Sequence, residues 1–214
     1  LFLITKKNNT KKIIKEKKIN KNQIIDIKDI SKLINNLKGK KFIIDNKTCS
    51  IFHEDIIKSK FKILDKDDPI YKLKSIKNSH EINHMIEAHK KDGLALTKFI
   101  YWIKNINKKT ITEVEAQNKL EKFRKLSKDY LTPSFNTIAG SGSNGAIVHY
   151  RATTKTTKKI NKKDLFLVDS GGQYSYGTTD VTRTICFTSQ KQSTKNAYTN
   201  VLKGHIAVAL TDLK

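Results

Sequence analysis

The chain has 214 residues, of which 37% are hydrophobic, and a formal net charge of +23 at pH 7. It contains no run of eighteen or more apolar residues, which argues against a transmembrane helix. Its two cysteines, Cys49 and Cys186, are too few for a disulfide framework and lack the spacing of metal-binding cysteines. These features predict a cytoplasmic protein without a membrane partner. Because the chain begins at Leu1 and its only methionine is Met85, we expect a fragment of a longer protein.

The positive charge comes almost entirely from lysine. Among the 43 basic residues, the only arginines are Arg124, Arg151 and Arg183, and the lysines are spread along the chain among Asn and Ile. Nucleic-acid sites usually combine arginine with stacking aromatic residues. The composition is therefore more typical of an AT-rich genome than of a specific nucleic-acid partner, although weak, salt-dependent binding to polyanions is expected.

The first part of the chain has the pattern of a small α/β layer. Residues 40–45 ("KKFIID") and 61–65 ("FKILD") predict strands, and residues 51–59 ("IFHEDIIKS") predict a short helix between them. This region, up to about residue 74, is too small to be a confident domain by itself.

A long helix is predicted from Ser79, a plausible N-cap, through residue 106. Its apolar stripe comprises Ile82, Met85 or Ile86, His89, Leu96, Phe99, Ile100 and Ile103. His80 and His84 are four residues apart, a spacing that permits metal binding on one helical face. No Glu or Cys completes that set in the zinc-protease form, so surface or packing histidines are the favoured interpretation.

A second helix is predicted over residues 110–127. A capping box starts it, formed either by Thr112 with Glu115 or by Thr110 with Glu113. The apolar stripe of this helix comprises Val114, Leu120, Phe123 and Leu126.

After Pro133 the pattern becomes that of β-structure. Two short apolar pieces flank the glycine-rich segment 139–145, which matches no phosphate-binding fingerprint and more plausibly lets the backbone bend beside a cavity. Residues 162–172 predict a strand with a turn, residues 178–187 predict a second strand, and a final helix begins near Ser193.

Two aspartates flank the connection between those strands. Asp169 ends one strand and Asp180 precedes the next, eleven residues later. If the strands fold back as a hairpin, both carboxylates reach one face, where a divalent cation such as Mn²⁺ would offset their repulsion. The alternative is ordinary turn chemistry at Asp169 and strand capping at Asp180.

His149 is a third candidate, at the end of the run "GAIVHY" that follows the glycine-rich segment. Its imidazole could face a substrate and exchange a proton near neutral pH. The alternative is a histidine packed at the end of a strand.

Three motifs carry a resemblance to a known family: "NTIAGSGSNGAIVHYR", "LFLVDSGGQYSYGTTDVTRT" and "VLKGHIAV". With these motifs, residues 68–214 resemble the aminopeptidase P family of Xaa-Pro aminopeptidases. That family has the pita-bread fold, shared with creatinase, prolidase and methionine aminopeptidase. The resemblance implies an α+β fold in which residues 75–214 form the N-terminal half of a pita-bread metallopeptidase domain. Residues 1–74 would be the C-terminal part of a creatinase N-terminal-like α/β domain.

The resemblance also implies roles for single residues. Asp169 would bind one metal ion, and Asp180 would bridge two ions, usually manganese, with zinc or cobalt as alternatives. His149 would line the substrate pocket and stabilise the scissile peptide or its tetrahedral intermediate. Thr182 would contact the metal ligands rather than the metal. A metal-bound hydroxide would then attack the carbonyl of the first residue in a peptide that begins Xaa-Pro.

The sequence departs from the family pattern in its ligand set. The family uses two Asp, one His and two Glu, whereas this chain has no Glu after Asp180. We therefore expect this chain to be inactive alone, to expose surface that the second half of the fold would cover, and to form a homodimer only at full length. A catalytically dead basic binding protein and a prolidase- or creatinase-type hydrolase remain alternatives.

Overall fold

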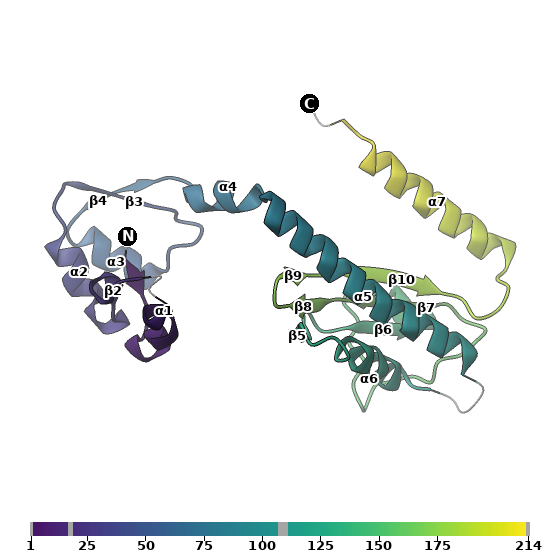
Figure 1. The fold of residues 1–214 in the computed structure, drawn as a ribbon. Coiled ribbons are helices and arrows are strands. Elements are labelled where there is room, and N and C mark those ends of the chain that lie inside the picture. The colour runs from purple at the N-terminus through teal and green to yellow at the C-terminus, as the bar shows by residue number, and fades with distance from the viewer. Residues whose placement is uncertain (1, 17–18, 107–110, 213–214) are drawn as a thin grey trace. The chain divides into compact units, whose positions relative to one another are not determined.

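The computed structural model describes residues 2–16, 19–106 and 111–212 of a mixed α+β chain. The chain divides into two compact units, Leu1–Ile76 and Lys77–Lys214 (Figure 1). Within the described ranges, no helix combines the length and the apolar character needed to cross a membrane.

The first unit contains two small parallel sheets with helices packed beside them. Strand β1 (Leu3–Ile4) pairs with β2 (Ile24–Ile25), and β3 (Lys41–Ile44) pairs with β4 (Lys62–Asp65). The helices are α1 (Lys11–Lys15), α2 (Ile30–Asn36), α3 (Ile51–Lys58) and α4 (Pro69–Ser75), with single 3₁₀ turns at Lys7–Thr10, Lys21–Gln23 and Ile27–Asp29. The predicted strand–helix–strand order of β3, α3 and β4 is confirmed. The hydrophobic core of the first unit comprises Ile30, Ile34, Ile44, Ile57 and Phe61.

The second unit begins with the long helix α5 (Ser79–Asn105). Its N-cap is Asn78 and not Ser79 as predicted, because Asn78 and Glu81 form a reciprocal capping box. The predicted apolar stripe is wrong at the start of the helix, where Ile82 and Ile86 are 49% and 46% exposed. The buried face comprises Ala88, Asp92, Ala95, Leu96, Phe99 and Ile103.

Helix α6 (Glu113–Arg124) starts with the capping box of Thr112 and Glu115. The other predicted pair involves Thr110, which lies outside the described residues. The buried face comprises Glu113, Ala116, Leu120 and Arg124, so the predicted stripe is correct at Leu120 but wrong at Leu126, which is exposed. Two charged side chains therefore lie on the face that contacts the rest of the unit.

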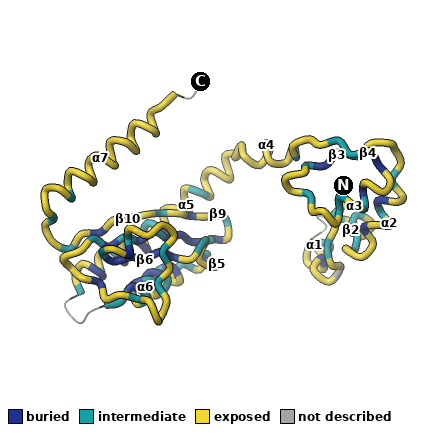
Figure 2. The backbone as a smooth tube through the Cα atoms, turned by 180° about the vertical axis from the view of Figure 1, so that it is seen from behind, coloured by how far each residue is buried: buried dark blue, intermediate teal, exposed yellow. Residues whose placement is uncertain are grey.

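Two antiparallel sheets follow. The order of the first is β10 (Val181–Ile185), β7 (Phe166–Ser170) and β6 (Ile138–Ser141). The order of the second is β5 (Tyr130–Pro133), β8 (Gly172–Tyr174) and β9 (Gly177–Thr178). Alternate residues of the first sheet pack against α5 and α6, and Figure 2 shows the buried positions concentrated there. This core comprises Leu96, Phe99, Ile103, Ala116, Leu120, Ala139, Ile160, Phe166, Val168 and Ile185.

The predicted final helix is α7 (Gln192–Ala209), and none of its residues is buried (Figure 2). Its apolar side chains are exposed, including Val201 at 74% and Ile206 at 47%. The helix therefore presents an amphipathic surface that nothing in the described chain covers.

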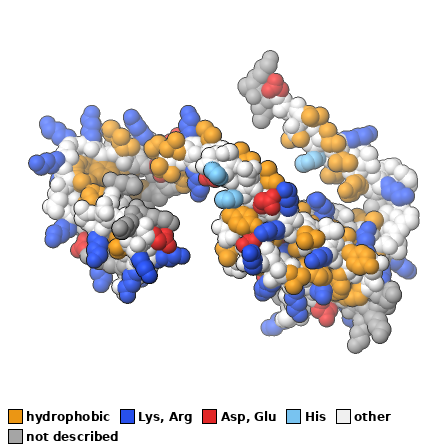
Figure 3. Space-filling model, in the orientation of Figure 1, with side chains coloured by type: hydrophobic (Ala, Val, Ile, Leu, Met, Phe, Trp, Pro, Cys, Tyr) orange, Lys and Arg blue, Asp and Glu red, His pale blue; other side chains and the backbone are white. Residues whose placement is uncertain are grey.

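Basic side chains lie over both units on the face shown in Figure 3. They are separated by apolar and neutral side chains and do not form a single stripe on that face. This distribution agrees with the compositional interpretation of the +23 charge.

Candidate metal centre

The antiparallel pairing of β7 with β10 places Asp169 directly opposite Thr182. The Thr182 hydroxyl donates a hydrogen bond of 2.8 Å to Oδ1 of Asp169. Val168 and Ser170, the neighbours of Asp169 in β7, are buried, whereas Asp169 is half-buried. Because successive strand residues point to opposite faces, the Asp169 carboxylate lies on the face turned away from the α5–α6 core.

Asp180 is exposed and lies immediately before β10. It precedes Thr182 by two residues but lies outside the strand, where alternation no longer fixes the direction of a side chain. The pairing of β7 with β10 thus brings Asp169 and Thr182 together and leaves Asp180 one residue before the start of β10.

His149 lies apart from that strand pair, in a turn after the 3₁₀ helix η4 (Gly142–Ala146). It is exposed, as are its neighbours Ile147 and Val148, and it is therefore not packed at a strand end. Its φ of 55° is the only positive φ among the described non-glycine residues. Such a conformation is uncommon for a residue with a side chain and has to be held by the surrounding structure.

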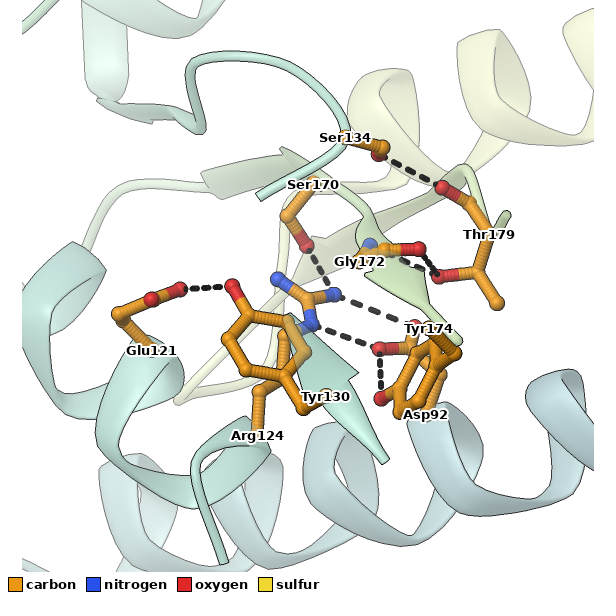
Figure 4. A network of polar contacts seen from close by, with 9 residues as sticks. All are labelled: Asp92, Glu121, Arg124, Tyr130, Ser134, Ser170, Gly172, Tyr174 and Thr179. Carbon is orange, nitrogen blue, oxygen red and sulfur yellow. Dashed lines mark hydrogen bonds and ion pairs between the residues drawn. The ribbon is translucent and has the colours of Figure 1, made fainter. Parts of the chain in front are cut away.

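The connection between Asp169 and Asp180 is not a simple hairpin turn. It forms β8 and β9, and a buried network anchors it to α5 and α6 (Figure 4). Arg124 of α6 donates to Asp92 of α5 through Nε at 2.6 Å and Nη2 at 3.2 Å, and both side chains are fully buried. The same Nη2 donates to the Ser170 hydroxyl at 3.0 Å, and the Tyr174 hydroxyl donates to Asp92 at 3.0 Å. The ion pair therefore holds the connection at Ser170, next to Asp169, and again on β8.

A second set of contacts fixes the end of the connection next to Asp180. The Ser134 hydroxyl donates to the backbone oxygen of Thr179 at 2.8 Å, and the Thr179 hydroxyl accepts from the Gly172 amide at 2.9 Å (Figure 4). A Cβ atom at Gly171 would lie 1.9 Å from the Thr179 oxygen, so only glycine fits there. Both candidate ligands thus adjoin tightly packed backbone.

Sequence patterns overlooked Asp92 and Arg124, although a signal was present. Asp92 stands four residues after Ala88 and before Leu96, on the buried stripe of α5. Arg124 stands four residues after Leu120 on the buried stripe of α6. A charged residue at a helical core position, on each of two neighbouring helices, is the pattern of a buried ion pair.

The histidines of α5 do not form a metal site. His80 and His84 are exposed, the His84 ring lies 5.5 Å from the Tyr176 ring, and His89 Nδ1 lies 2.8 Å from the Met85 oxygen. Across residues 2–16, 19–106 and 111–212, no three His, Cys, Asp or Glu side chains are grouped to hold an ion. The candidate donor set is therefore the two carboxylates, which suit hard or borderline divalent cations.

Residues 83–211 match the sequence model of "Metallopeptidase family M24". The chain belongs to metallopeptidase family M24. Over 185 residues, it is 40% identical to "Xaa-Pro aminopeptidase ApepP" of Drosophila melanogaster, in a match that covers 86% of this chain and 30% of the fly protein. Both candidate ligands and His149 lie inside the M24 match.

Solved M24 structures agree with the fold. The X-prolyl aminopeptidase of Caenorhabditis elegans, described as a cytosolic enzyme with a di-nuclear active site, superposes with a TM-score of 0.70 at 28% identity, covering 80% of this chain and 29% of that one. The Xaa-Pro dipeptidase of Bacillus anthracis superposes with a TM-score of 0.77 at 23% identity, covering 96% of this chain and 57% of that one. The mixed α+β chain thus matches pita-bread M24 enzymes over most of its length. It spans less than a third of the length of the curated relatives it matches.

Proposed function

We propose that this chain supplies part of an Xaa-Pro aminopeptidase, which releases the first residue from peptides with proline in second position. The observation that carries the proposal is the β7–β10 register, which pairs Asp169 with Thr182, with Asp180 next to the start of β10 and all three within the M24 match. Residues 75–214 are proposed to be the first half of the catalytic domain, and residues 1–74 part of the domain before it.

Asp169 and Asp180 fit a metal site in their chemistry but not in their number. Both are carboxylates on an accessible face, and one Asp169 oxygen is oriented by Thr182. Two such groups suit Mn²⁺, with zinc or cobalt as alternatives. A pair of divalent ions would supply Lewis-acid polarisation of a carbonyl and activation of water. The remaining ligands must come from residues other than those described here.

His149 is proposed to contact the substrate. Its imidazole is exposed in a turn of unusual backbone conformation, beside the apolar side chains of Ile147 and Val148. An exposed imidazole N–H can donate a hydrogen bond to a developing oxyanion. The exposed apolar neighbours suit an uncharged peptide segment.

Two experiments test the proposal. First, the 214-residue chain is incubated with Mn²⁺ and a peptide that begins Xaa-Pro, and the released amino acid is measured. We expect no turnover, because two carboxylates bind metal weakly; metal-dependent turnover lost in Asp169→Asn would contradict the proposed inactivity of the isolated chain.

Second, the coding region is read on both sides of this sequence, and the protein of the whole reading frame is assayed. We expect manganese-dependent release of the first residue, loss of activity in Asp180→Asn, and a lowered kcat in His149→Ala.

Cleavage of Xaa-Pro dipeptides alone would instead indicate a prolidase. Tight binding to nucleic acid at physiological salt without peptidase activity would favour the binding protein. Sedimentation and fractionation of the same protein test the proposed homodimer and cytoplasmic location.

A further inference from the structure

Glu113, in the first turn of α6, is a fully buried carboxylate, and its hydrogen-bond partners among the described residues are uncharged donor groups. It accepts from the backbone amides of Ser141 at 2.8 Å and Lys158 at 2.9 Å. It also accepts from Asn144 Nδ2 at 3.0 and 3.2 Å and from the Tyr150 hydroxyl at 2.9 Å. An ionised carboxylate offers about four acceptor positions, so these four groups saturate it.

All four donors belong to one segment, residues 141–158, which contains the turn with His149. Ser141 and Asn144 precede His149, whereas Tyr150 and Lys158 follow it. Asn144 Nδ2 also donates to the Tyr150 hydroxyl at 2.7 Å, so the two sides of the turn are joined directly. One side chain of α6 therefore fixes both ends of the turn that presents His149.

Further contacts make this anchoring stiff. Gly140 packs against the backbone of Gly145. A Cβ atom added to Gly140 would lie 2.7 Å from the Gly145 amide nitrogen. The Val114 amide donates to the Thr157 hydroxyl at 3.2 Å, and the Glu113 amide donates to the Lys158 oxygen at 3.0 Å. Burial of the Tyr150 hydroxyl and its bond to Glu113 both raise the pKa of Tyr150, which keeps the donor proton in place.

A buried carboxylate without a cationic partner is costly, since desolvation opposes it. The anchored turn holds His149 at a φ of 55°. His149 is exposed, and so are the apolar side chains of the same turn. The turn has little packing of its own to fix the direction of the imidazole.

We propose that Glu113 is a positioning residue for His149, acting through Tyr150 and the amides of the 141–158 segment. The inference rests on the proposed function for its catalytic consequence, but its structural part stands without it. In Glu113→Gln, the side-chain amide would offer one acceptor oxygen and would turn an NH₂ group toward N–H donors. This substitution therefore preserves shape while breaking part of the anchor.

The first test uses the chain itself and amide hydrogen exchange with NMR of the His149 ring. In Glu113→Gln we expect exchange of residues 142–150 to accelerate at least about 10-fold and the His149 ring signals to shift. The β7 amides should stay unchanged. Tyr150→Phe should act in the same direction with a smaller effect, and it replaces Glu113→Gln in the test if that variant fails to fold.

Glu115→Gln is the matched control, because Glu115 is exposed in the same helix and Gln can also form a capping box. Unchanged exchange and ring signals in both anchor variants would overturn the inference.

The second test uses the protein of the whole reading frame and separates positioning from stability by a double-mutant cycle. Glu113→Gln should lower kcat with little change in Mn²⁺ affinity, and the loss should vanish when His149 is already Ala. An equal loss in both backgrounds would show that Glu113 does not act through His149. If the whole protein hydrolyses no Xaa-Pro peptide, the proposed function fails, and the exchange test still decides the structural part.

Discussion

The Nε atom of Arg124 lies 2.6 Å from Oδ1 of Asp92, and neither side chain is exposed to solvent. This pair joins α5 to α6 and contacts both Ser170 and Tyr174, which lie between the two candidate metal ligands. A buried charge pair that sequence patterns overlooked thus anchors the segment between the two candidate ligands.

Arg124→Met should strongly destabilise the second unit, because it leaves the Asp92 carboxylate buried without its partner. Removal of one member of a buried pair costs about 3–5 kcal/mol, to be measured by urea unfolding. Lys125→Met is the matched control: its ammonium is exposed and pairs only along the helix surface with Glu121, so a change below about 0.5 kcal/mol is expected. Equal effects of the two substitutions would contradict the described network.

Thr182→Val should affect metal binding more than stability. The Thr182–Asp169 bond lies at an accessible face, so its loss should cost at most about 1 kcal/mol of unfolding free energy. Removal of a residue that orients a metal ligand lowers metal affinity by about 10-fold or more. An Mn²⁺ titration of the protein of the whole reading frame, followed by electron paramagnetic resonance, would detect this loss. Thr184→Val, two residues further on the same exposed side of β10, is the control. Identical titrations for both variants would remove Thr182 from the candidate site.

Gly171→Ala should destabilise the connection between the candidate ligands. Its Cβ would lie 1.9 Å from the Thr179 oxygen and 2.2 Å from the Ser134 hydroxyl, so backbone must move. Overpacking of this kind costs about 1–3 kcal/mol. Gly93→Ala, in the middle of α5 with no atom within 4 Å of the new methyl, should instead stabilise the protein, by about 0.5–1 kcal/mol. Thermal unfolding of the two variants should therefore shift in opposite directions.

The protein should lose stability at alkaline pH. Burial and the bond to Glu121 raise the pKa of Tyr130, and burial and Asp92 raise the pKa of Tyr174. Tyrosines of the unfolded chain titrate near pH ~10, so the folded protein retains these protons above that pH and the unfolded chain does not. The stability they contribute is present below pH ~10 and is lost as the pH rises through the folded pKa values.

The check is the slope of unfolding free energy against pH above pH ~10, compared between the natural chain and Tyr130→Phe/Tyr174→Phe. The double variant should have the shallower slope. Tyr198→Phe, on the exposed surface of α7, should keep the original one. A double variant as steep as the natural chain would assign the alkaline loss to other groups.

Sequence patterns predicted the elements whose signal is local. Apolar runs predicted β3, β4 and β7, capping residues limited the start of α6 to two adjacent possibilities, and alternation predicted β10. Strand period and spacing predicted one face for Asp169, Asp180 and Thr182, and the β7–β10 register confirms the pairing of Asp169 with Thr182.

The remaining features depend on contacts between distant residues. Strands β8 and β9 are short and rich in Gly and Tyr, so they resembled a turn, and they exist because β8 pairs with β5 about 40 residues earlier. The start of the apolar stripe on α5 was misplaced because Ile82 and Ile86 follow the helical period but contact no core. Glu113 was considered only as a capping residue, since no local pattern indicates that it reaches residues 141–158.

The Arg124–Asp92 pair also constrains how the protein is made. Tyr174 reaches Asp92 across 82 residues of sequence, and Ser170 follows Arg124 by 46 residues. On the ribosome, α5 and α6 therefore emerge well before the strands that enclose their charges. A nascent chain halted before Ser170 should carry α5 and α6 with an ion pair that no strand yet encloses, a state that chaperones rather than packing must protect.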